Sequence, residues 1–231
     1  MKLFNTIRNA IKYNAKLMKS RYNDCNISFS QWGEDIIVNN IFNNLKYNSI
    51  TYLDIGANHP IVLNNTWFFY LNNMKGVLVE PDPELCKLLK KYRKKDIVIN
   101  SGAGQKGNLT LYKFNNHSLN TFSQKEAESN LQKNNNYRII NKVSINILPI
   151  NSIISENFDS YPNFISIDVE GMEMEILQDF NFETFKTEVF CIETYSWAED
   201  RRVVEIIDFM QKKGYRIYSE TGLNTIFIRN F

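Results

Sequence analysis

The sequence predicts an α/β fold in which helices flank a mostly parallel sheet. Short apolar segments that suit buried strands alternate with helical segments along most of the chain. Two of the first strands end in a carboxylate, at Asp54 and at Glu80, and the chain closes with the pattern of an antiparallel hairpin at 214–218 and 225–228. Ligands bind at the carboxyl ends of the strands in open α/β sheets, so we expect the functional site at that edge.

The composition limits the classes of protein to which this chain can belong. The 231 residues allow one domain, or one domain with an appendage, and the formal net charge of +2 gives no general reason to expect nucleic acid. The three cysteines stand far apart and in no metal-binding spacing, which predicts a reducing, cytoplasmic location rather than a disulfide framework. No apolar run reaches the roughly 18 residues that a membrane span needs.

We expect residues 1–29 to form a basic amphipathic helical arm and residues 30–231 to form the main domain. Residues 1–22 contain six basic residues and no acid, and their apolar residues fall mostly on one helical stripe. The stripe can pack on the domain. Alternatively, the arm can contact a membrane surface or another anionic partner, and the protein is then membrane-peripheral.

A helix is predicted after Ser30, which is a suitable N-cap, because apolar residues follow it at helical spacing up to Leu45. Glu34 is interpreted as an ordinary acid of the first helical turn. Gln31 and Asp35 are either further first-turn residues or groups that reach a ligand above the sheet.

The turn after the first strand separates two classes of ligand. A dinucleotide fingerprint needs three glycines, but only Gly56 is present, and Asn58 and Ile61 occupy the other two positions. Asp54 places a negative charge there, which suits an ammonium or sulfonium group and repels phosphate. A nicotinamide-dependent oxidoreductase is therefore the weaker alternative. We expect Asp54, Gly56, Ala57 and Asn58 to bind the ligand.

The second strand ends at Glu80, which Pro81 and Asp82 follow. A carboxylate in this place can accept hydrogen bonds from two ribose hydroxyls. Together with the charge of Asp54, the pattern describes a nucleoside with a cationic tail, which is S-adenosylmethionine. We expect Glu80, Pro81 and Asp82 to bind this cofactor.

Further cofactor contacts are predicted at two turns. Thr66 starts an aromatic helix and lies at the cofactor end of the sheet. Ser101 and Gly102 follow the third strand, where small residues leave room for an adenine ring, although an ordinary turn explains them nearly as well. A helix over 83–92 precedes that strand, and we expect the basic run at 90–95 to be solvated.

The segment 105–150 is less regular. Strands are predicted near 109–114 and 143–148, and the stretch 115–136 between them is polar. A long polar insertion in a compact domain is usually functional or without fixed structure. We expect it to carry part of the pocket for the methyl acceptor, with His117, Ser118 and Asn120 as candidates.

Two later strands also end in carboxylates. Asp168 and Glu170 alternate along the chain, which places them on the same side, and Glu193 ends the next strand. Burial of an unpaired carboxylate is costly, so the three acids predict a polar cavity at one edge of the sheet. Glu173 and Glu175 are interpreted as solvated acids of the following helix.

Methyl transfer from a sulfonium is an in-line displacement, and a hydroxyl acceptor must lose its proton as the new bond forms. Asp168, Glu170 or Glu193 can take this proton, because clustered like charges raise one another's pKa. His59 is a competing base, and an ordinary hydrogen-bonded loop histidine explains it equally well. The three carboxylates also permit a divalent metal, but nothing fixes a coordination geometry, so no metal ligand is assigned.

Nucleic acid is not the expected substrate. Methyltransferases of adenine or cytosine amino groups resemble one another in an Asp/Asn-Pro-Pro-aromatic loop, where this chain has Asp168-Val169-Glu170-Gly171. Cytosine C5 enzymes need a nucleophilic cysteine, which no suitable loop supplies. A small-molecule or glycan acceptor is expected instead.

Several motifs resemble those of the FkbM family of methyltransferases: Ser30-Gln31-Trp32-Gly33-Glu34-Asp35, Leu53-Asp54-Ile55-Gly56-Ala57-Asn58, Val79-Glu80-Pro81-Asp82, Ile167-Asp168-Val169-Glu170-Gly171 and Ile192-Glu193. The resemblance implies a Rossmann-like class I sheet of seven strands with an antiparallel terminal hairpin. It also implies S-adenosylmethionine as donor and O-methylation, often of sugars in bacterial surface polysaccharides or of natural products. His59-Pro60 departs from the Ile/Tyr-Gly of many members. A non-catalytic binding module with the same fold is the remaining alternative.

Overall fold

The computed structural model describes residues 26–197 and 199–230. The amphipathic helix predicted for the first 22 residues therefore lies outside the described residues, and so does Cys25. Within the described part of the chain, no helix has the length and apolar character needed to cross a bilayer.

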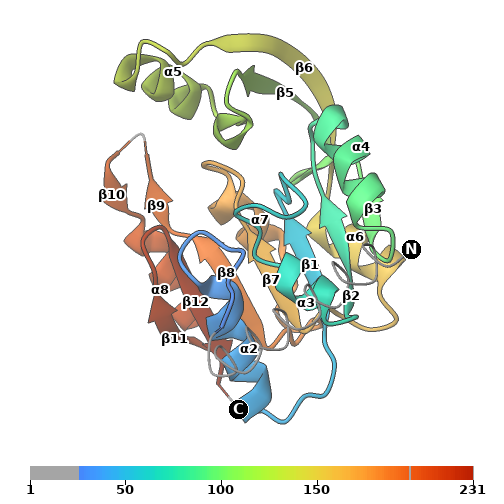
Figure 1. Ribbon diagram of the computed structural model, residues 1–231. Helices are drawn as coiled ribbons and strands as arrows, with labels where there is room; N and C mark the ends of the chain where they lie inside the picture. The colour runs from blue at the N-terminus through green and yellow to red at the C-terminus, as the bar shows by residue number, and fades with distance from the viewer. Residues whose placement is uncertain (1–25, 198, 231) are drawn as a thin grey trace, which may run out of the picture.

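A seven-stranded sheet lies at the centre of the molecule, and it confirms the predicted fold class (Figure 1). From edge to edge its strands are β3 (Ile97–Ile99), β2 (Lys75–Val79), β1 (Thr51–Ile55), β7 (Phe164–Ile167), β8 (Val189–Glu193), β12 (Asn224–Arg229) and β11 (Tyr215–Glu220). The first five run parallel, and β12 runs antiparallel to both of its neighbours. The chain therefore has the Rossmann-like class I sheet with its terminal hairpin.

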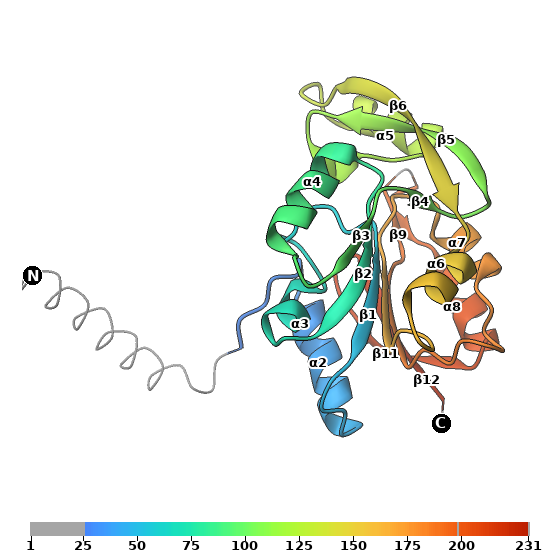
Figure 2. The ribbon, with the colours of Figure 1, turned by 90° about the vertical axis from the view of Figure 1, so that its right-hand side faces the viewer.

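Helices cover both faces of this sheet (Figure 2). One face carries α2 (Glu34–Asn44), α3 (Trp67–Leu71) and α4 (Pro83–Tyr92), and the other carries α6 (Ile150–Asn157), α7 (Glu173–Asp179) and α8 (Val204–Lys212). Each face has its own apolar core. In β1, Leu53 packs in the core on the α6 side and Tyr52 in the core on the α2 side, because successive side chains of a strand point to opposite faces.

The strand register brings four strand ends together. Ile55 at the end of β1 pairs with Val79 of β2 and with Ile167 of β7, and Ile167 pairs in turn with Ile192 of β8. The residues that follow these positions therefore meet at one edge of the sheet. Parallel strands in neighbouring positions always end on the same side, so this edge is where a ligand can contact several loops at once.

A smaller unit, residues 102–148, lies above that edge (Figure 1). It contains a three-stranded sheet of β4 (Gly102–Ala103), β6 (Ile139–Leu148) and β5 (Gly107–Phe114). The polar stretch 115–136 is more regular than predicted, because it holds the 3₁₀ helix η1 (His117–Leu119) and the helix α5 (Gln124–Lys133). The Ser123 side chain caps α5 by accepting from the Glu126 backbone N–H, which is a local stabilisation that mean polarity does not reveal.

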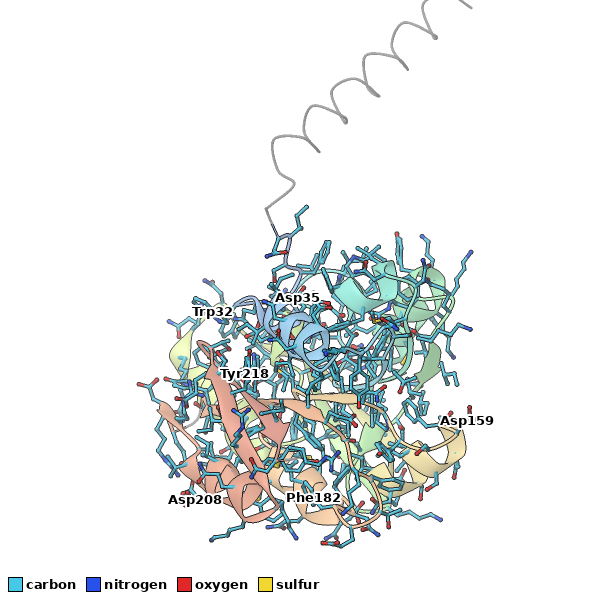
Figure 3. All side chains as sticks on the ribbon, turned by 90° about the horizontal axis from the view of Figure 1, so that it is seen from below. Trp32, Asp35, Asp159, Phe182, Asp208 and Tyr218 are labelled. Carbon is cyan, nitrogen blue, oxygen red and sulfur yellow. The ribbon has the colours of Figure 1, made fainter. Side chains whose placement is uncertain are left out.

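The start of α2 differs from the prediction. The helix begins at Glu34 after Gly33, and Ser30 is not its N-cap residue. Asp35 orders the preceding loop instead: its carboxylate accepts from the Phe29 backbone N–H at 2.7 Å and from the Ser28 and Ser30 hydroxyls at 2.6 and 3.0 Å. Figure 3 shows Asp35 and Trp32 beside the first turn of α2. A carboxylate can accept several donors at once, which explains why this residue organises the loop.

Glu34 is also more than an ordinary first-turn acid. It is fully buried, and its Oε1 accepts from the Thr221 hydroxyl at 2.6 Å and from the Asn224 side-chain amide at 2.9 Å. These hydrogen bonds lower the pKa of Glu34 against the opposing effect of burial. The first turn of α2 is thereby attached to the terminal hairpin, nearly the whole length of the domain away in sequence.

Candidate active site

A cavity of about 290 Å³ opens at the carboxyl edge of the parallel strands. Its wall combines the turns that follow β1, β2, β3, β7 and β8 with residues of the 102–148 unit. Eleven of the predicted site residues line it: Gln31, Gly56, Asn58, His59, Glu80, Pro81, Ser101, Gly102, Asp168, Glu170 and Glu193. His117, Ser118 and Asn120, predicted for the acceptor pocket, line it too. Segments that are far apart in sequence thus supply a single concave surface, as ligand sites in open α/β sheets require.

Position 56 requires a glycine because the turns after β1 and β7 come close together there. Its φ is +83°, in the region that favours glycine, and a Cβ at this position would overlap the carbonyl oxygen of Asp168. The backbone N–H groups of Gly56 and Ala57 both donate to the carbonyl of Val79. The glycine therefore allows the turns after β1 and β7 to touch while its own backbone faces the cavity.

Glu80 is held in place by the backbone. Its side chain is 3% exposed, one carboxylate oxygen accepts from the Asn58 N–H and the other from the Asp82 N–H, each at 2.8 Å. Burial raises the pKa of Glu80 to about 7, and the two backbone hydrogen bonds oppose that rise. A carboxylate has about four acceptor positions, so Glu80 keeps capacity for further donors at the cavity wall.

Two buried polar atoms in this wall have no hydrogen-bond partner. They are the side-chain oxygen of Asn58, beside Glu80, and the hydroxyl of Ser101, at the end of β3. Buried polar atoms are nearly always satisfied in native proteins, so orphans that border a cavity point to a polar ligand. Asn58 has a φ of +49°, which an asparagine tolerates better than most residues and which turns its N–H toward Glu80.

Asp54 does not line the cavity. It is buried beneath the turn, where it accepts from the Thr66 hydroxyl at 2.7 Å and from the Asn64 amide at 3.4 Å. Burial raises its pKa, while these hydrogen bonds and the nearby Arg93 guanidinium oppose the rise. Thr66 is likewise buried and engaged with Asp54. Both residues order the turn from below.

The basic run at 90–95 was predicted to be solvated, but Arg93 is buried. It is fully buried, and it donates to Asp96 at 2.8 Å, to the Thr66 hydroxyl at 3.0 Å and to the Asn64 side chain at 3.1 Å. A buried guanidinium needs such partners, because each unsatisfied donor is costly. Arg93 supplies the positive charge next to Asp54, and no local sequence feature distinguishes it from its exposed lysine neighbours.

Ala57, Asp35 and Asp82 also lie outside the cavity wall. Ala57 belongs to the apolar core on the α2 side. Asp82 is the N-cap of α4: it accepts from the Glu84 N–H at 2.9 Å and forms an ion pair with Lys113 at 2.9 Å. That ion pair connects the turn after β2 to the 102–148 unit.

The predicted convergence of Asp168, Glu170 and Glu193 is confirmed. Carboxylate oxygens from the three residues lie within 4.8 Å of one another. The cause is not strand alternation, because β7 ends at Ile167 and Glu170 has a φ of +55° in the turn that follows. A left-handed residue turns the chain back, so that Glu170 faces the end of β8. Strain of this kind persists only where the surroundings hold it, and it is frequent at functional sites.

The carboxyl groups in this cluster are protonated more readily than free ones. Burial raises the pKa of Asp168 to about 6, although a hydrogen bond with Glu193 opposes the rise. Burial, Glu170 and Asp168 raise the pKa of Glu193, and burial and Asp168 raise that of Glu170. Both Asp168 and Glu193 are therefore protonated more readily than ordinary carboxyl groups.

Two acids beside the cluster were missed by the sequence analysis. Glu173 is not solvated: it is 6% exposed and accepts from the backbone N–H groups of Val169 at 3.1 Å and Gly171 at 3.2 Å. Burial raises the pKa of Glu173 to about 7. Glu126 of α5 is equally buried, and its Oε1 accepts from the Ser196 hydroxyl at 3.2 Å. Glu175, by contrast, is exposed as predicted.

His59 lies in the cavity wall next to His117, with 6.4 Å between the centroids of the stacked rings. Its Nδ1 accepts from the backbone N–H groups of Ile61 at 3.2 Å and Val62 at 3.0 Å. The neutral ring therefore carries its proton on Nε2 and offers a donor there. Burial and the neighbouring His117 lower the pKa of His59, which keeps the ring neutral.

Comparison with known proteins follows this geometry. The family model described as "Methyltransferase FkbM domain" matches residues 54–217, which include the glycine turn, Glu80 and the three clustered carboxylates. No curated protein matches the chain.

Solved structures with a similar chain path are methyltransferases of several kinds. A Staphylococcus aureus protein described as a caffeoyl-CoA O-methyltransferase is 9% identical with a TM-score of 0.48 and covers 99% of this chain and 98% of its own. A TehB-like S-adenosylmethionine-dependent methyltransferase from Corynebacterium glutamicum is 9% identical with a TM-score of 0.44, over 96% of this chain and 100% of its own. The 1,6-didemethyltoxoflavin-N1-methyltransferase of Burkholderia thailandensis, solved with S-adenosylhomocysteine, is 9% identical with a TM-score of 0.42, over 96% and 87%.

The family match extends over more than half of the chain and includes most of the residues that line the cavity. This protein belongs to the FkbM methyltransferase family.

Proposed function

We propose that the protein transfers the methyl group of S-adenosylmethionine to a hydroxyl of a sugar or of a natural-product precursor. The observation that carries the proposal is a single cavity with two different ends. One end has the backbone-held carboxylate of Glu80 and the orphaned oxygens of Asn58 and Ser101. The other end has the carboxylates of Asp168, Glu170 and Glu193.

The first end fits an adenosine group. Glu80 retains acceptor positions for the two hydroxyls of a ribose, and Asn58 and Ser101 each present a buried oxygen without a partner. A Cβ at Gly102 would overlap the Ile147 side chain and the Phe122 ring, so the missing side chain makes room for these two residues. Apolar side chains suited to a flat base line the same region: Pro81, Leu85, Ala103 and Leu111.

The second end fits a positive charge. S-adenosylmethionine, when bound, supplies an electrophilic methyl group on a sulfonium. Asp168 and Glu170 are carboxylates of this cavity wall, and a cation beside them replaces part of the solvation that they lose by burial. This replacement also favours their ionised forms, because a nearby opposite charge lowers the pKa of a carboxyl group.

Asp168 is the proposed general base. Its pKa is about 6, whereas the pKa values of Glu170 and Glu193 are raised well above the ordinary value, so Asp168 loses its proton most readily of the three. A hydroxyl placed against it can transfer its proton to the carboxylate as the oxygen forms the new bond to carbon. Glu193 donates a hydrogen bond to Asp168 and positions it. His59 presents a hydrogen-bond donor at Nε2. Its proposed role is therefore to orient an oxygen atom of the ligand, and not to remove a proton.

Calorimetry with S-adenosylhomocysteine tests the cofactor assignment. Glu80→Ala should abolish measurable binding, and Ser101→Ala should weaken it severalfold. Glu156→Ala is the matched control, because Glu156 is an exposed acid of α6 on the other side of the sheet. Equal affinities for the wild type and Glu80→Ala would refute the assignment. Transfer of a labelled methyl group to a panel of neutral glycosides then tests the class of acceptor.

A further inference from the structure

A second cavity, of about 260 Å³, lies beside the first. Its walls come from α5, from the loop that enters α7, and from the hairpin of β9 (Tyr195–Ser196) and β10 (Arg201–Arg202). Figure 1 shows α5 above this hairpin, on the side of the sheet where β8 ends. Two contacts join α5 to the hairpin: Lys125 forms an ion pair with Glu199 at 2.6 Å, and the Lys133 ammonium donates to the Trp197 carbonyl.

Glu170 and Glu193 line both cavities. A molecule in the second cavity therefore lies against Glu170 and Glu193, whereas Asp168 lines the first cavity alone. Methyl transfer needs the acceptor oxygen and the sulfur on opposite sides of the reacting carbon, so a ring in the second cavity must extend its hydroxyl past Glu170 and Glu193 to reach Asp168 and the methyl group.

Carboxyl groups outnumber cations in the wall of the second cavity. Six acids line it: Glu126, Glu170, Glu173, Glu193, Glu199 and Glu205. The cations in its wall are Lys125 and Arg201, and both already form ion pairs, Lys125 with Glu199 and Arg201 with Glu199 at 2.7 Å and with Glu205 at 3.3 Å. The described residues of the wall therefore offer no free cation to a phosphate group.

An orphaned acceptor within this wall points to a ligand. Glu126 is 6% exposed, and its Oε2 has no hydrogen-bond partner, while its Oε1 accepts from Ser196. A buried carboxylate oxygen without a donor is rare, and a hydroxyl or ammonium group of a ligand would satisfy it. A phosphate or carboxylate would not, because it brings more acceptors and more negative charge.

The cavity also has an apolar, aromatic side. The rings of Tyr195 and Trp197 pack edge to face with 5.2 Å between centroids, and Trp197 is 36% exposed. Met174, Val203 and Ile206 extend this surface. Aromatic faces together with a few hydrogen-bond acceptors suit a ring that has an apolar face and a rim of hydroxyls.

We propose that this second cavity holds the methyl acceptor, and that it selects an uncharged polyhydroxylated ring over the same ring carrying a phosphate. The proposal rests on the proposed function and adds the place and the charge of the acceptor. It also implies an order of reactions: the transfer that removes a sugar from its nucleotide carrier precedes methylation, because a nucleoside diphosphate at the reacting ring would find no free cation among the described residues of the wall and would meet the orphaned acceptor of Glu126.

Matched pairs of probes test the charge selection. Methyl glycosides of glucose, galactose, mannose, fucose and rhamnose are compared with the nucleoside diphosphate forms of the same sugars, by saturation-transfer NMR on the full chain saturated with S-adenosylhomocysteine. At least one neutral glycoside should bind, and its nucleotide form should bind at least about tenfold more weakly, a difference of about 1.4 kcal/mol. Tighter binding of the nucleotide forms, or binding of none of the probes, overturns the proposal.

Variants test the place of binding. Glu126→Gln and Trp197→Ala should each weaken the glycoside severalfold while leaving the affinity for S-adenosylhomocysteine within about twofold, since neither residue lines the first cavity. Glu156→Gln is the control for charge. Unchanged glycoside affinity in both variants contradicts the assignment of this cavity. Loss of S-adenosylhomocysteine binding in the wild type would instead refute the proposed function, so the two failures are distinguishable.

Discussion

The carboxyl groups of Asp168 and Glu193 share a hydrogen bond at the ends of two neighbouring parallel strands. Ile167 of β7 pairs with Ile192 of β8, so the next residue of each strand emerges at the same level. Carboxylate oxygens of the two residues lie within 4.8 Å of each other, so ionisation of one disfavours ionisation of the other. The register of the sheet thus creates a carboxylate and its hydrogen-bond donor without any further element.

The rate of methyl transfer should depend on the ionisation of Asp168. Its pKa of about 6 lies above the ordinary value, so the carboxyl group is protonated and inactive as a base below that pH. We expect kcat/KM, which reports the free enzyme, to rise with pH through about 6 and then to level off. A pH–rate profile between pH 5 and 8.5 checks this, with Glu156→Gln as a variant that should give the same profile. A flat profile across that range contradicts the assignment of Asp168.

Replacement of Asp168 by asparagine should separate proton removal from binding. Asp168→Asn keeps the shape and loses the base, so kcat should fall by about a hundredfold or more. S-adenosylhomocysteine is uncharged at sulfur, so its affinity should change little, whereas S-adenosylmethionine should bind more weakly because a counter-charge is lost. Calorimetry with both compounds provides the measurement. Equal losses for the two compounds would indicate general damage to the site.

The acid cluster should make the free protein less stable as the pH rises. Glu80, Glu173 and Asp168 have pKa values of about 7, 7 and 6 in the folded state, above those of unfolded carboxyl groups. The folded state therefore binds more protons than the unfolded state, and the free energy of unfolding decreases as pH increases from about 4 to about 7. Melting temperatures measured over this range should fall. Glu173→Gln should flatten the decrease by several degrees at the alkaline end, and an unaltered slope in that variant would show that Glu173 does not contribute.

Gly56 and Gly214 form a matched pair for substitution. Both have a positive φ, +83° and +87°, but a Cβ at Gly56 would overlap the Asp168 carbonyl, whereas a Cβ at Gly214 has no atom within 4 Å. Gly214→Ala should cost about 1 to 2 kcal/mol of unfolding free energy from the left-handed conformation alone. Gly56→Ala should cost clearly more, and it should also abolish S-adenosylhomocysteine binding. Urea unfolding measures both, and equal losses would mean that the contact with Asp168 relaxes freely.

Arg93 should be indispensable to the turn that holds Asp54. Its removal leaves Asp96 and Asp54 buried without a nearby cation, and breaking a buried ion pair by deleting one partner costs about 3 to 5 kcal/mol. Arg93→Ala should therefore unfold at much lower urea concentration. Lys94→Ala, at the exposed neighbouring position, should behave as the wild type. A small loss in Arg93→Ala would show that water replaces the guanidinium.

Much of the fold follows from local patterns. Helix α4 has the predicted bounds, 83–92, because Pro83 and the preceding Asp82 form a helix start. The short apolar run 97–99 forms the edge strand β3, which is partly exposed. The acids at the ends of β2, β7 and β8 were predicted to lie at one edge of the sheet, and they line one cavity there, since parallel strands end together. Helix α5 was missed because its composition is polar and only its cap and a few buried residues reveal it.

The sequence by itself determined the type of fold, the edge that carries the site and the acids that surround it, because strand periodicity and turn chemistry act over a few residues. Only the tertiary structure decided which acids line the cavities. Asp54 and Asp35 are occupied by donors of their own loops, whereas Glu126 and Glu173 are brought to the cavities from segments that sequence patterns interpret as solvent-exposed. The orientation of a charged side chain depends on the partners that it contacts in the folded protein. These partners are distant in sequence: Arg93 donates to Thr66, and Ser196 donates to Glu126.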